Sequence, residues 1–311
     1  MNTIEPIYIA FATDENYVQH LGVTMLSLLH TLKTRTPLHI FVLGDNLSVE
    51  SVAMITQIAE DHNTSISFPT VNFERFGDLG LKRHQSRVTY ATLAIPEIIG
   101  VDKVLYLDCD LLVRCDISPL WEIDISKYYL GAVLDTFFSG LNGKQQLDSR
   151  LGMPPGTPYF NAGMLLMNLK KWRQDKEIVD KAIKFKVKNP GTHCNDQDGL
   201  NATLWGKWYP FHPRWNVQTY TFRMCYESKL RRMLPEEFIE AVKDPAIVHY
   251  TTGIKPWHYA CRVPYVEEYY KYLAMTPWKN YRPARTFAGI LNKNIRMIRR
   301  RVTGAMLGYR V

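Results

Sequence analysis

Residues 103–113 read KVLYLDCDLLV, an apolar run interrupted only by Cys109 and by the carboxylates of Asp108 and Asp110. Its Val and Leu content predicts a buried β-strand. On a continuous strand, residues two apart lie on the same face. Because unpaired carboxylates are costly in a buried strand, we expect both at the strand's carboxyl end, where open α/β sheets bind ligands. The oxygen ligands would suit a hard divalent cation, Mn²⁺ or Mg²⁺. The alternative is an ordinary pair of surface aspartates, since Asp-x-Asp is common by chance.

Apolar runs alternate with helical patterns on both sides of this stretch. A proline at position 69 places the third predicted strand at a sheet edge. Alternation of this kind predicts an α/β fold with a mostly parallel central sheet wrapped by helices. The predicted strands are residues 6–12, 38–43, 65–71, 129–134, 160–167 and 245–250, and the predicted helices are 15–32, 48–60, 89–99, 174–188, 196–205 and 264–275.

The composition is that of a folded globular protein. The 311 residues are 46% hydrophobic and 22% charged, which excludes disordered and fibrous classes. The five cysteines form no C-x-x-C pair, which argues against a disulfide framework or a structural zinc site and for a reducing compartment. We expect neither a signal peptide nor a membrane-spanning helix.

The net charge of +8 is concentrated at the C-terminal end. Residues 269–311 contain ten Lys/Arg and no Asp or Glu, which leaves 28 basic against 30 acidic residues, a net charge of −2, for residues 1–268. This distribution argues against nucleic-acid binding by the whole protein. Residues 287–306 predict an amphipathic helix with an apolar stripe and a basic face. We expect it to bind an anionic membrane surface, assisted by Trp278 and Tyr281, and the alternative is a helix docked on the body.

Four further motifs contain residues that can bind ligands. Residues 11–17 (FATDENY) follow the first predicted strand, and this position lacks the Gly-rich patterns of dinucleotide-binding and P-loop proteins. Residues 159–168 (YFNAGMLLMN) place Gly163 in a strand. Residues 194–201 (CNDQDGLN) contain Asp196 and Asp198 at a helix start, where we expect one of the two to be a simple cap. Residues 249–258 (HYTTGIKPWH) combine an imidazole with a lysine, a metal ligand with a phosphate partner.

Together and in this order, the motifs resemble glycosyltransferase family 8, which has the GT-A, Rossmann-like nucleotide-sugar-binding fold. The family includes glycogenin and bacterial lipopolysaccharide galactosyl- and glucosyltransferases. The resemblance extends from about residue 7 to residue 258 and is closest to short lipooligosaccharide α-galactosyltransferases, which also have a basic tail. It implies a retaining, metal-dependent hexosyltransferase that moves galactose or glucose from UDP-Gal or UDP-Glc to a lipid-linked saccharide of the lipopolysaccharide or lipooligosaccharide core. We expect a catalytic domain at 1–260 and a helical, membrane-associating region at 261–311.

The resemblance also implies roles for individual residues. Asp108, Asp110 and His249 would ligate Mn²⁺ or Mg²⁺. Gln197 and Asp196 would act at the reacting sugar, with Gln197 on the β-face of its anomeric carbon and Asp196 on its hydroxyls. An amide oxygen is a poor nucleophile, so front-face retention is favoured over a covalent intermediate on Asp196. The implied donor-binding residues are Ala12, Thr13, Asp14 (uracil), Asn16 (ribose), Asp108, Cys109, Asp135, Asn161, Ala162, Gly253 and Lys255 (diphosphate).

The sequence departs from the family pattern at two positions. Thr92 stands where the family usually has an Arg near the donor, which leaves galactose and glucose both open. Thr252 stands where the family commonly has Gly, and Gly253 follows it.

Three alternatives to this function remain. The first is a nucleotidyltransferase, which would need a Gly-rich phosphate loop after the first strand. The second is an inactive sugar-nucleotide-binding protein, which should have lost a metal ligand. The third is a glucosyltransferase of another acceptor, glycogenin-like or acting on a protein glycan. For the leading function, the expected location is cytoplasmic, peripheral on the inner face of the inner membrane.

Overall fold

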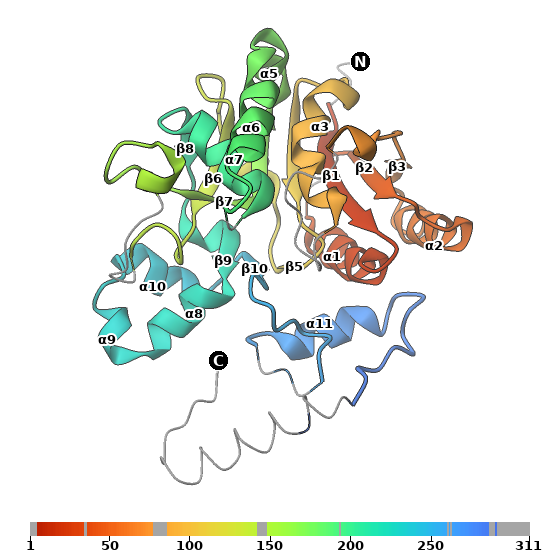
Figure 1. The fold of residues 1–311 in the computed structure, drawn as a ribbon. Coiled ribbons are helices and arrows are strands. Elements are labelled where there is room, and N and C mark those ends of the chain that lie inside the picture. The colour runs from red at the N-terminus through yellow and green to blue at the C-terminus, as the bar shows by residue number, and fades with distance from the viewer. Residues whose placement is uncertain are drawn as a thin grey trace.

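A seven-stranded sheet forms the centre of the computed structural model, which describes residues 5–33, 36–76, 86–141, 148–192, 194–259, 261, 263–285 and 290 (Figure 1). The strand order is β3-β2-β1-β4-β7-β6-β8. Only β7 runs antiparallel to its neighbours β4 and β6, so the prediction of a mostly parallel α/β sheet is confirmed. The strands are β1 (Ile7–Asp14), β2 (Leu38–Asp45), β3 (Ser65–Ser67), β4 (Lys103–Leu107), β6 (Leu130–Leu134), β7 (Phe160–Asn168) and β8 (Trp208–Pro210).

The run at residues 103–113 is not one strand, as predicted, but two. β4 ends at Leu107, the chain turns at Cys109 and Asp110, and β5 (Leu111–Val113) enters a second sheet of order β5-β10-β9. There β5 pairs antiparallel with β10 (Ile247–His249), which pairs with β9 (Val217–Gln218). The break falls at the polar residues, because a carboxylate inside a sheet covered on both faces would have no partner.

Helices cover both faces of the central sheet, and alternate strand residues face each layer. On β1, Ile9 and Phe11 pack in a cluster with α1 (Val18–Thr31) and α2 (Val49–Glu60), whereas Ala10 and Ala12 face the opposite cluster. That cluster includes residues of α3 (Ala91–Ile98), α5 (Leu169–Gln174), α6 (Glu177–Lys188) and α7 (Asn195–Leu204).

The helix boundaries differ from the prediction at two places. The segment predicted as 89–99 begins as a 3₁₀ turn at Arg87–Tyr90 and continues as α3, with Pro96 inside the helix. The segment predicted as 174–188 is preceded by α5, and the chain turns at Asp175 before α6 begins. Besides α5, four short helices were not predicted: α4 (Ser118–Trp121), α8 (Thr219–Tyr226), α9 (Ser228–Arg231) and α10 (Glu236–Lys243).

The last described helix, α11 (Val266–Leu273), is docked on the body. Glu268 accepts hydrogen bonds from Arg114 after β5, at 3.0 Å to Nε, and the Tyr269 hydroxyl lies 2.7 Å from His20 Nδ1 on α1. Trp278 packs against Gly22, where an added Cβ would lie 2.8 Å from the indole ring. Trp278, which was expected to assist membrane binding, therefore packs partly against the body. The predicted helix at 287–306 lies outside the described residues apart from Ile290.

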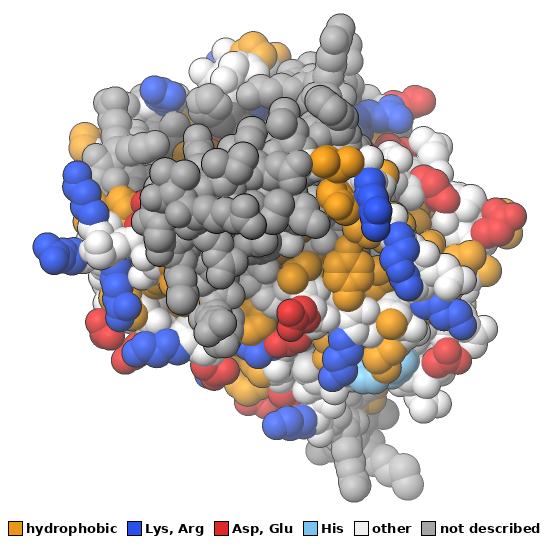
Figure 2. All heavy atoms as spheres, turned by 90° about the horizontal axis from the view of Figure 1, so that it is seen from below, with side chains coloured by type: hydrophobic (Ala, Val, Ile, Leu, Met, Phe, Trp, Pro, Cys, Tyr) orange, Lys and Arg blue, Asp and Glu red, His pale blue; other side chains and the backbone are white. Residues whose placement is uncertain are grey.

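Basic and hydrophobic side chains lie side by side on the face seen from below (Figure 2). Met275 is 50% exposed on this part of the chain, and Lys271, Lys279, Arg282 and Arg285 are also exposed. Among the residues described, no helix is long and apolar enough to cross a membrane.

Candidate functional site

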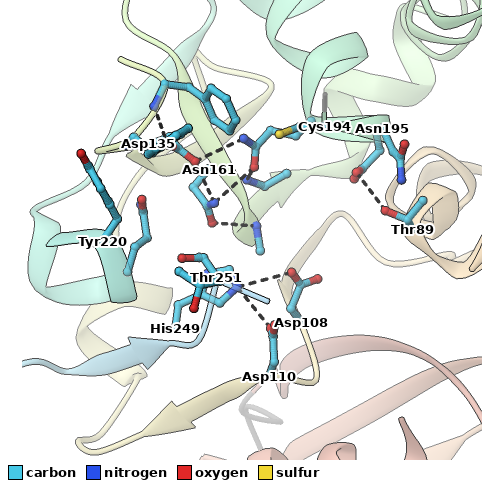
Figure 3. Close-up of a pocket in the computed structure, with 18 of the residues that line it drawn as sticks. Thr89, Asp108, Asp110, Asp135, Asn161, Cys194, Asn195, Tyr220, His249 and Thr251 are labelled. Atoms are coloured by element: carbon cyan, nitrogen blue, oxygen red, sulfur yellow. Dashed lines mark hydrogen bonds and ion pairs between the residues drawn. The ribbon is translucent and has the colours of Figure 1, made fainter. Parts of the chain in front are cut away.

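Three potential metal ligands converge where the two sheets meet (Figure 3). Asp108 follows β4, Asp110 precedes β5, and His249 ends β10. The Nε2 atom of His249 lies 3.2 Å from Asp110 Oδ1 and 3.7 Å from Asp108 Oδ2. One ligand atom from each residue lies within 4.8 Å of the other two. The turn therefore brings together the three residues predicted as ligands.

Each of the three side chains has a separate partner on its outer side. Asp108 Oδ1 accepts a hydrogen bond from the Tyr106 hydroxyl at 2.7 Å, and Asp110 Oδ2 lies 2.5 Å from Lys255 Nζ. The ammonium of Lys255 also donates to the carbonyl of Tyr250. His249 Nδ1 lies 2.9 Å from Asn216 Oδ1, and the other ring nitrogen faces the carboxylates.

A cation fits the space between these three groups. Asp110 Oδ1 is buried and has no hydrogen-bond partner, although it lies 3.2 Å from the imidazole. A cation would satisfy this oxygen, because two carboxylates and one imidazole form a donor set that hard divalent metals accept. The set is thus consistent with the Mn²⁺ or Mg²⁺ expected from the sequence.

The surroundings of the two carboxylates shift their pKa values in opposite directions. Burial and the neighbouring charge of Asp110 raise the pKa of Asp108 above its usual value. Burial also acts to raise the pKa of Asp110, but Lys255 and His249 outweigh it and lower that pKa well below its usual value. Asp110 is therefore an ionised carboxylate with a cationic partner on one side.

Because Gly163 on β7 has no side chain, there is room beside it for Asp108 and His249. A Cβ at this position would lie 2.2 Å from His249 Cε1 and 2.6 Å from Asp108 Oδ2. The Gly163 carbonyl accepts a hydrogen bond from the Asp108 amide at 2.9 Å, which holds the turn against β7. The glycine is therefore required by close approach.

The cluster opens into a cavity of about 580 Å³ whose opposite wall contains Asp135, Asn161 and Gln197. Gln197 Oε1 accepts hydrogen bonds from the Ala162 amide at 2.8 Å and from Asn161 Nδ2 at 3.2 Å. Its Nε2 donates to Asp135 Oδ2 at 3.3 Å and to the Tyr159 hydroxyl at 3.0 Å. The carboxamide is thus held at both ends.

Asp196 lies at the start of α7 in the same cavity and is buried. Its carboxylate accepts a hydrogen bond from the Thr92 hydroxyl at 2.8 Å, and Thr89 lies 3.4 Å away. Burial raises its pKa to about 7. Thr92, at the position where the family usually has Arg, therefore gives the Asp196 carboxylate an uncharged hydrogen-bond donor.

Neither aspartate of this motif is the N-cap expected from the sequence, because α7 begins at Asn195 with Cys194 as its N-cap. Asp198 instead accepts from the N-cap amide. Its Oδ2 accepts a hydrogen bond from the Cys194 amide, the N-cap of α7, at 2.7 Å, and Oδ1 accepts one from Tyr159 at 2.7 Å. Both oxygens are occupied by the protein.

The residues expected to bind the nucleoside lie outside this cavity, at the end of β1. Asp14 Oδ1 accepts hydrogen bonds from the amides of Asn16 and Tyr17, so it holds its own turn. Ala12 and Thr13 are buried, and the Ala12 carbonyl lies 3.1 Å from Cys109 Sγ. Tyr17, which was not named among the donor-binding residues, lies beside this turn and is 39% exposed.

The loop after His249 brings Lys255 to Asp110 but does not place Gly253 in the cavity. Thr252, at the second departure from the family, lines the cavity, and its hydroxyl donates to the Ile254 carbonyl at 3.2 Å. An added Cβ on Gly253 would meet nothing within 4 Å.

The sequence reasoning also missed Asn216 and an aromatic wall at the cavity mouth. The rings of Phe137 and Tyr220 meet edge to face with centroids 4.9 Å apart, and Phe138 continues the wall. The Phe137–Phe138 pair, two residues after Asp135, was the signal available in the sequence for that wall. Asn216, between Trp215 and Val217, offered none.

The chain is similar to known glycosyltransferases over most of its length. The family model "Glycosyl transferase family 8" matches residues 8–261. General stress protein A of Bacillus subtilis (strain 168) is 30% identical over 284 residues, which cover 89% of this chain and 96% of that protein. Lipopolysaccharide 1,2-glucosyltransferase of Escherichia coli (strain K12) is 28% identical, covering 91% and 82%. The crystal structure of galactosyltransferase LgtC with donor and acceptor sugar analogues superposes with a TM-score of 0.76 at 31% identity, covering 87% and 96%.

Proposed function

Because the chain belongs to glycosyl transferase family 8 and shares the GT-A fold of LgtC, we propose that it is a retaining, metal-dependent hexosyltransferase. The donor is UDP-Gal or UDP-Glc, and the acceptor is a lipid-linked saccharide of the lipopolysaccharide or lipooligosaccharide core. One relative is named as a glucosyltransferase and one as a galactosyltransferase, so both donor sugars remain in the proposal.

The convergence of Asp108, Asp110 and His249 carries this proposal. These residues would hold Mn²⁺ or Mg²⁺, and the unpartnered Asp110 Oδ1 supports that role. When bound, the cation supplies Lewis-acid stabilisation to the diphosphate leaving group. Lys255 adds a positive charge on the same side, because its ammonium is already within 2.5 Å of Asp110.

The nucleoside would bind at the end of β1. Asp14 would hold the uracil, Asn16 would meet the ribose, and the backbone of Ala12 and Thr13 would line the pocket with Cys109. The exposed ring of Tyr17 offers an apolar face on which the base can stack. Gly253 and Lys255 would then approach the diphosphate from the loop after β10.

The donor sugar would lie in the cavity, between the metal ligands and the wall formed by Asp135, Asn161 and Ala162. Asp196 would accept hydrogen bonds from its hydroxyls. Gln197 would lie at the anomeric centre, where its amide dipole stabilises oxocarbenium-like charge. Its oxygen already accepts hydrogen bonds from Ala162 and Asn161, which makes it a weak nucleophile. This arrangement favours front-face retention, with Gln197 and Asp196 as the catalytic residues.

The C-terminal region would bring the enzyme to a membrane. Exposed Lys271, Lys279, Arg282 and Arg285 begin a basic segment that continues through residues 286–311. Each basic residue near an anionic surface contributes ~1 kcal/mol of attraction. We therefore place the enzyme in the cytoplasm, peripheral on the inner face of the inner membrane, with the catalytic domain at 1–260 and the membrane-associating region at 261–311.

A donor panel without acceptor tests this function. The protein is incubated with UDP-sugars and Mn²⁺, and release of UDP is measured with and without EDTA. We expect release from UDP-Gal or UDP-Glc that EDTA abolishes and that Asp110→Asn lowers by at least tenfold. The matched control is Asp61→Asn, which changes an exposed carboxylate after α2 and should retain activity. Full activity in EDTA would contradict the metal-dependent mechanism.

A further inference from the structure

A chain of buried hydrogen bonds connects the metal-binding histidine to the sugar-binding wall. His249 Nδ1 lies 2.9 Å from Asn216 Oδ1, and Asn216 Nδ2 donates to Asn161 Oδ1 at 2.9 Å. Asn161 Nδ2 then donates to Gln197 Oε1 at 3.2 Å and to Asp135 Oδ2 at 3.1 Å. All the residues in this hydrogen-bonded series are more than nine-tenths buried, and Asn216 is only 1% exposed.

The backbone of β7 sets the direction of this chain. A backbone N–H can only donate, and the Gly163 amide donates to Asn161 Oδ1 at 3.1 Å while the Ala162 amide donates to Gln197 Oε1 at 2.8 Å. The oxygen of Asn161 must therefore point toward Gly163 and Asn216, and its amide nitrogen must point toward Gln197. Asn161 cannot flip without placing its NH₂ group against a backbone N–H.

The orientation of Asn161 determines that of Asn216 and then that of His249. Because Asn161 presents an oxygen, Asn216 must present its NH₂ group and turn its own oxygen toward the imidazole. An oxygen in that position accepts a hydrogen bond only from a protonated Nδ1. In the neutral ring, Nε2 then has a free lone pair directed at Asp108 and Asp110.

We propose that Asn216 is a positioning residue that, through Asn161, locks His249 in the tautomer able to bind a metal. The proposal rests on the metal-dependent function above. It predicts that a substitution of Asn161 alters the tautomer of His249, although the two side chains share no hydrogen bond, because Asn161 prevents Asn216 from flipping. It adds a role for Asn216 in W-N-V-Q (residues 215–218), which the sequence reasoning did not single out.

The tautomer can be read directly in the metal-free protein. Histidine is labelled with ¹⁵N, long-range ¹H–¹⁵N spectra are recorded with excess chelator, and His249 is identified by the signals lost in His249→Gln. Spectra are taken at a pH high enough for the imidazole to be neutral, because only a neutral ring has distinct tautomers. There we expect proton on Nδ1 alone in the wild type and a mixture of tautomers in Asn216→Ala and Asn161→Ala. By calorimetry, Mn²⁺ affinity should fall by about 10–100-fold in Asn216→Ala, the usual effect of losing the outer partner of a metal-binding histidine.

Two further variants separate the lock from a general loss of structure. Asn216→Asp loses the NH₂ donor to Asn161 but keeps an oxygen for the imidazole N–H, so it should retain proton on Nδ1 and bind Mn²⁺ better than Asn216→Ala. Asn201→Ala removes a buried amide that bonds only to backbone, at Phe160 and Gln197, and should leave the tautomer unchanged even where it lowers thermal stability.

The possible failures are distinguishable. Retention of a single Nδ1-protonated ring in folded Asn216→Ala and Asn161→Ala, or an equal tautomer change in Asn201→Ala, would overturn the lock. A wild-type protein that has this tautomer but does not bind Mn²⁺ would instead contradict the proposed metal function.

Discussion

Gly163 is a residue at which even one added methyl group should disturb the cluster of Asp108, Asp110 and His249. The Cβ of Gly163→Ala would meet His249 at 2.2 Å and Asp108 at 2.6 Å, so at least one ligand must move. We expect Mn²⁺ affinity to fall by at least tenfold in calorimetry, with a cost of about 1–3 kcal/mol in unfolding free energy from overpacking. Gly100→Ala is the matched control, because its Cβ would meet nothing within 4 Å and both properties should stay near wild type.

Asp196 should make the stability of the ligand-free protein depend on pH. Burial raises its folded pKa to about 7, against about 3.9 in an unfolded chain, so the folded protein binds more protons between pH ~4 and ~7. Its contribution to stability is therefore lost as pH rises through this interval. Asp196→Asn should remove that loss, measured as unfolding free energy at several pH values.

A carboxyl ¹³C titration provides a second check on Asp196. Its midpoint should lie near 7, and Thr92→Val should raise it further, because the lost hydroxyl donor stabilises the charged form. A midpoint near 4 in the wild type would contradict the expected burial effect.

Sequence reasoning identified single residues where their chemistry is unusual for their surroundings. Asp108 and Asp110 stand out in an apolar run, and His249 ends another, and the structure brings these three together. Asn216 could not be found in this way, because its role depends on the direction of hydrogen bonds set by β7. The roles of the donor-binding residues stay predictions derived from family resemblance.

At the scale of elements, the alternation of strands and helices predicted the central sheet, and the errors were missed turns and missed short elements. The run at 103–113 satisfies the criteria for one buried strand, since local pattern cannot reveal that its two halves join different sheets. The turn before α6 was missed for a related reason: Asp175 accepts a hydrogen bond from the Tyr129 hydroxyl, a tertiary contact. The fold class was predicted correctly because strands and helices alternate repeatedly along the chain. Dividing one strand or one helix in two does not alter that order.

The docking of α11 should depend on the ion pair between Glu268 and Arg114, the residue after β5. Arg114 donates to both Glu268 oxygens from Nε, and its guanidinium lies 4.1 Å from the centre of the Tyr265 ring. A double-mutant cycle with Arg114→Met and Glu268→Gln should give a coupling of about 1 kcal/mol in chemical denaturation, the upper end for partly exposed pairs. The exposed pair of Lys181 and Glu177 on α6 serves as control and should give ~0.3–0.5 kcal/mol. Equal couplings would show that the Arg114–Glu268 pair contributes no more to the docking of α11 than an ordinary exposed pair does.

At the scale of the whole molecule, the described body is complete before the basic end of the chain. The Tyr281 hydroxyl donates to the Trp257 carbonyl at 3.2 Å, and the candidate site needs no residue beyond Lys255. Deletion from Arg282 onward should therefore leave a folded protein whose UDP release is near normal, while transfer to a membrane-embedded acceptor drops.

Vesicle flotation checks the other half of this prediction. The intact protein should bind vesicles that contain anionic lipid, and binding should weaken with salt, because charges are screened over ~10 Å at 0.1 M. Neutral vesicles and the truncated protein are the controls. Aggregation of the truncated protein, or intact protein that ignores anionic vesicles, would favour a helix docked on the body.

The turn between β4 and β5 has a mechanical consequence, because it is the joint at which the chain passes from the larger sheet to the smaller one. Its two carboxylates flank the joint, and the third ligand comes from the smaller sheet. An ion bound by these three ligands would connect the two sheets, and its binding energy would oppose separation of the smaller sheet from the larger one. At a hundred times its dissociation constant the ion adds ~2.7 kcal/mol, so amide hydrogens of β5 and β10 that exchange through this opening should exchange about a hundredfold more slowly.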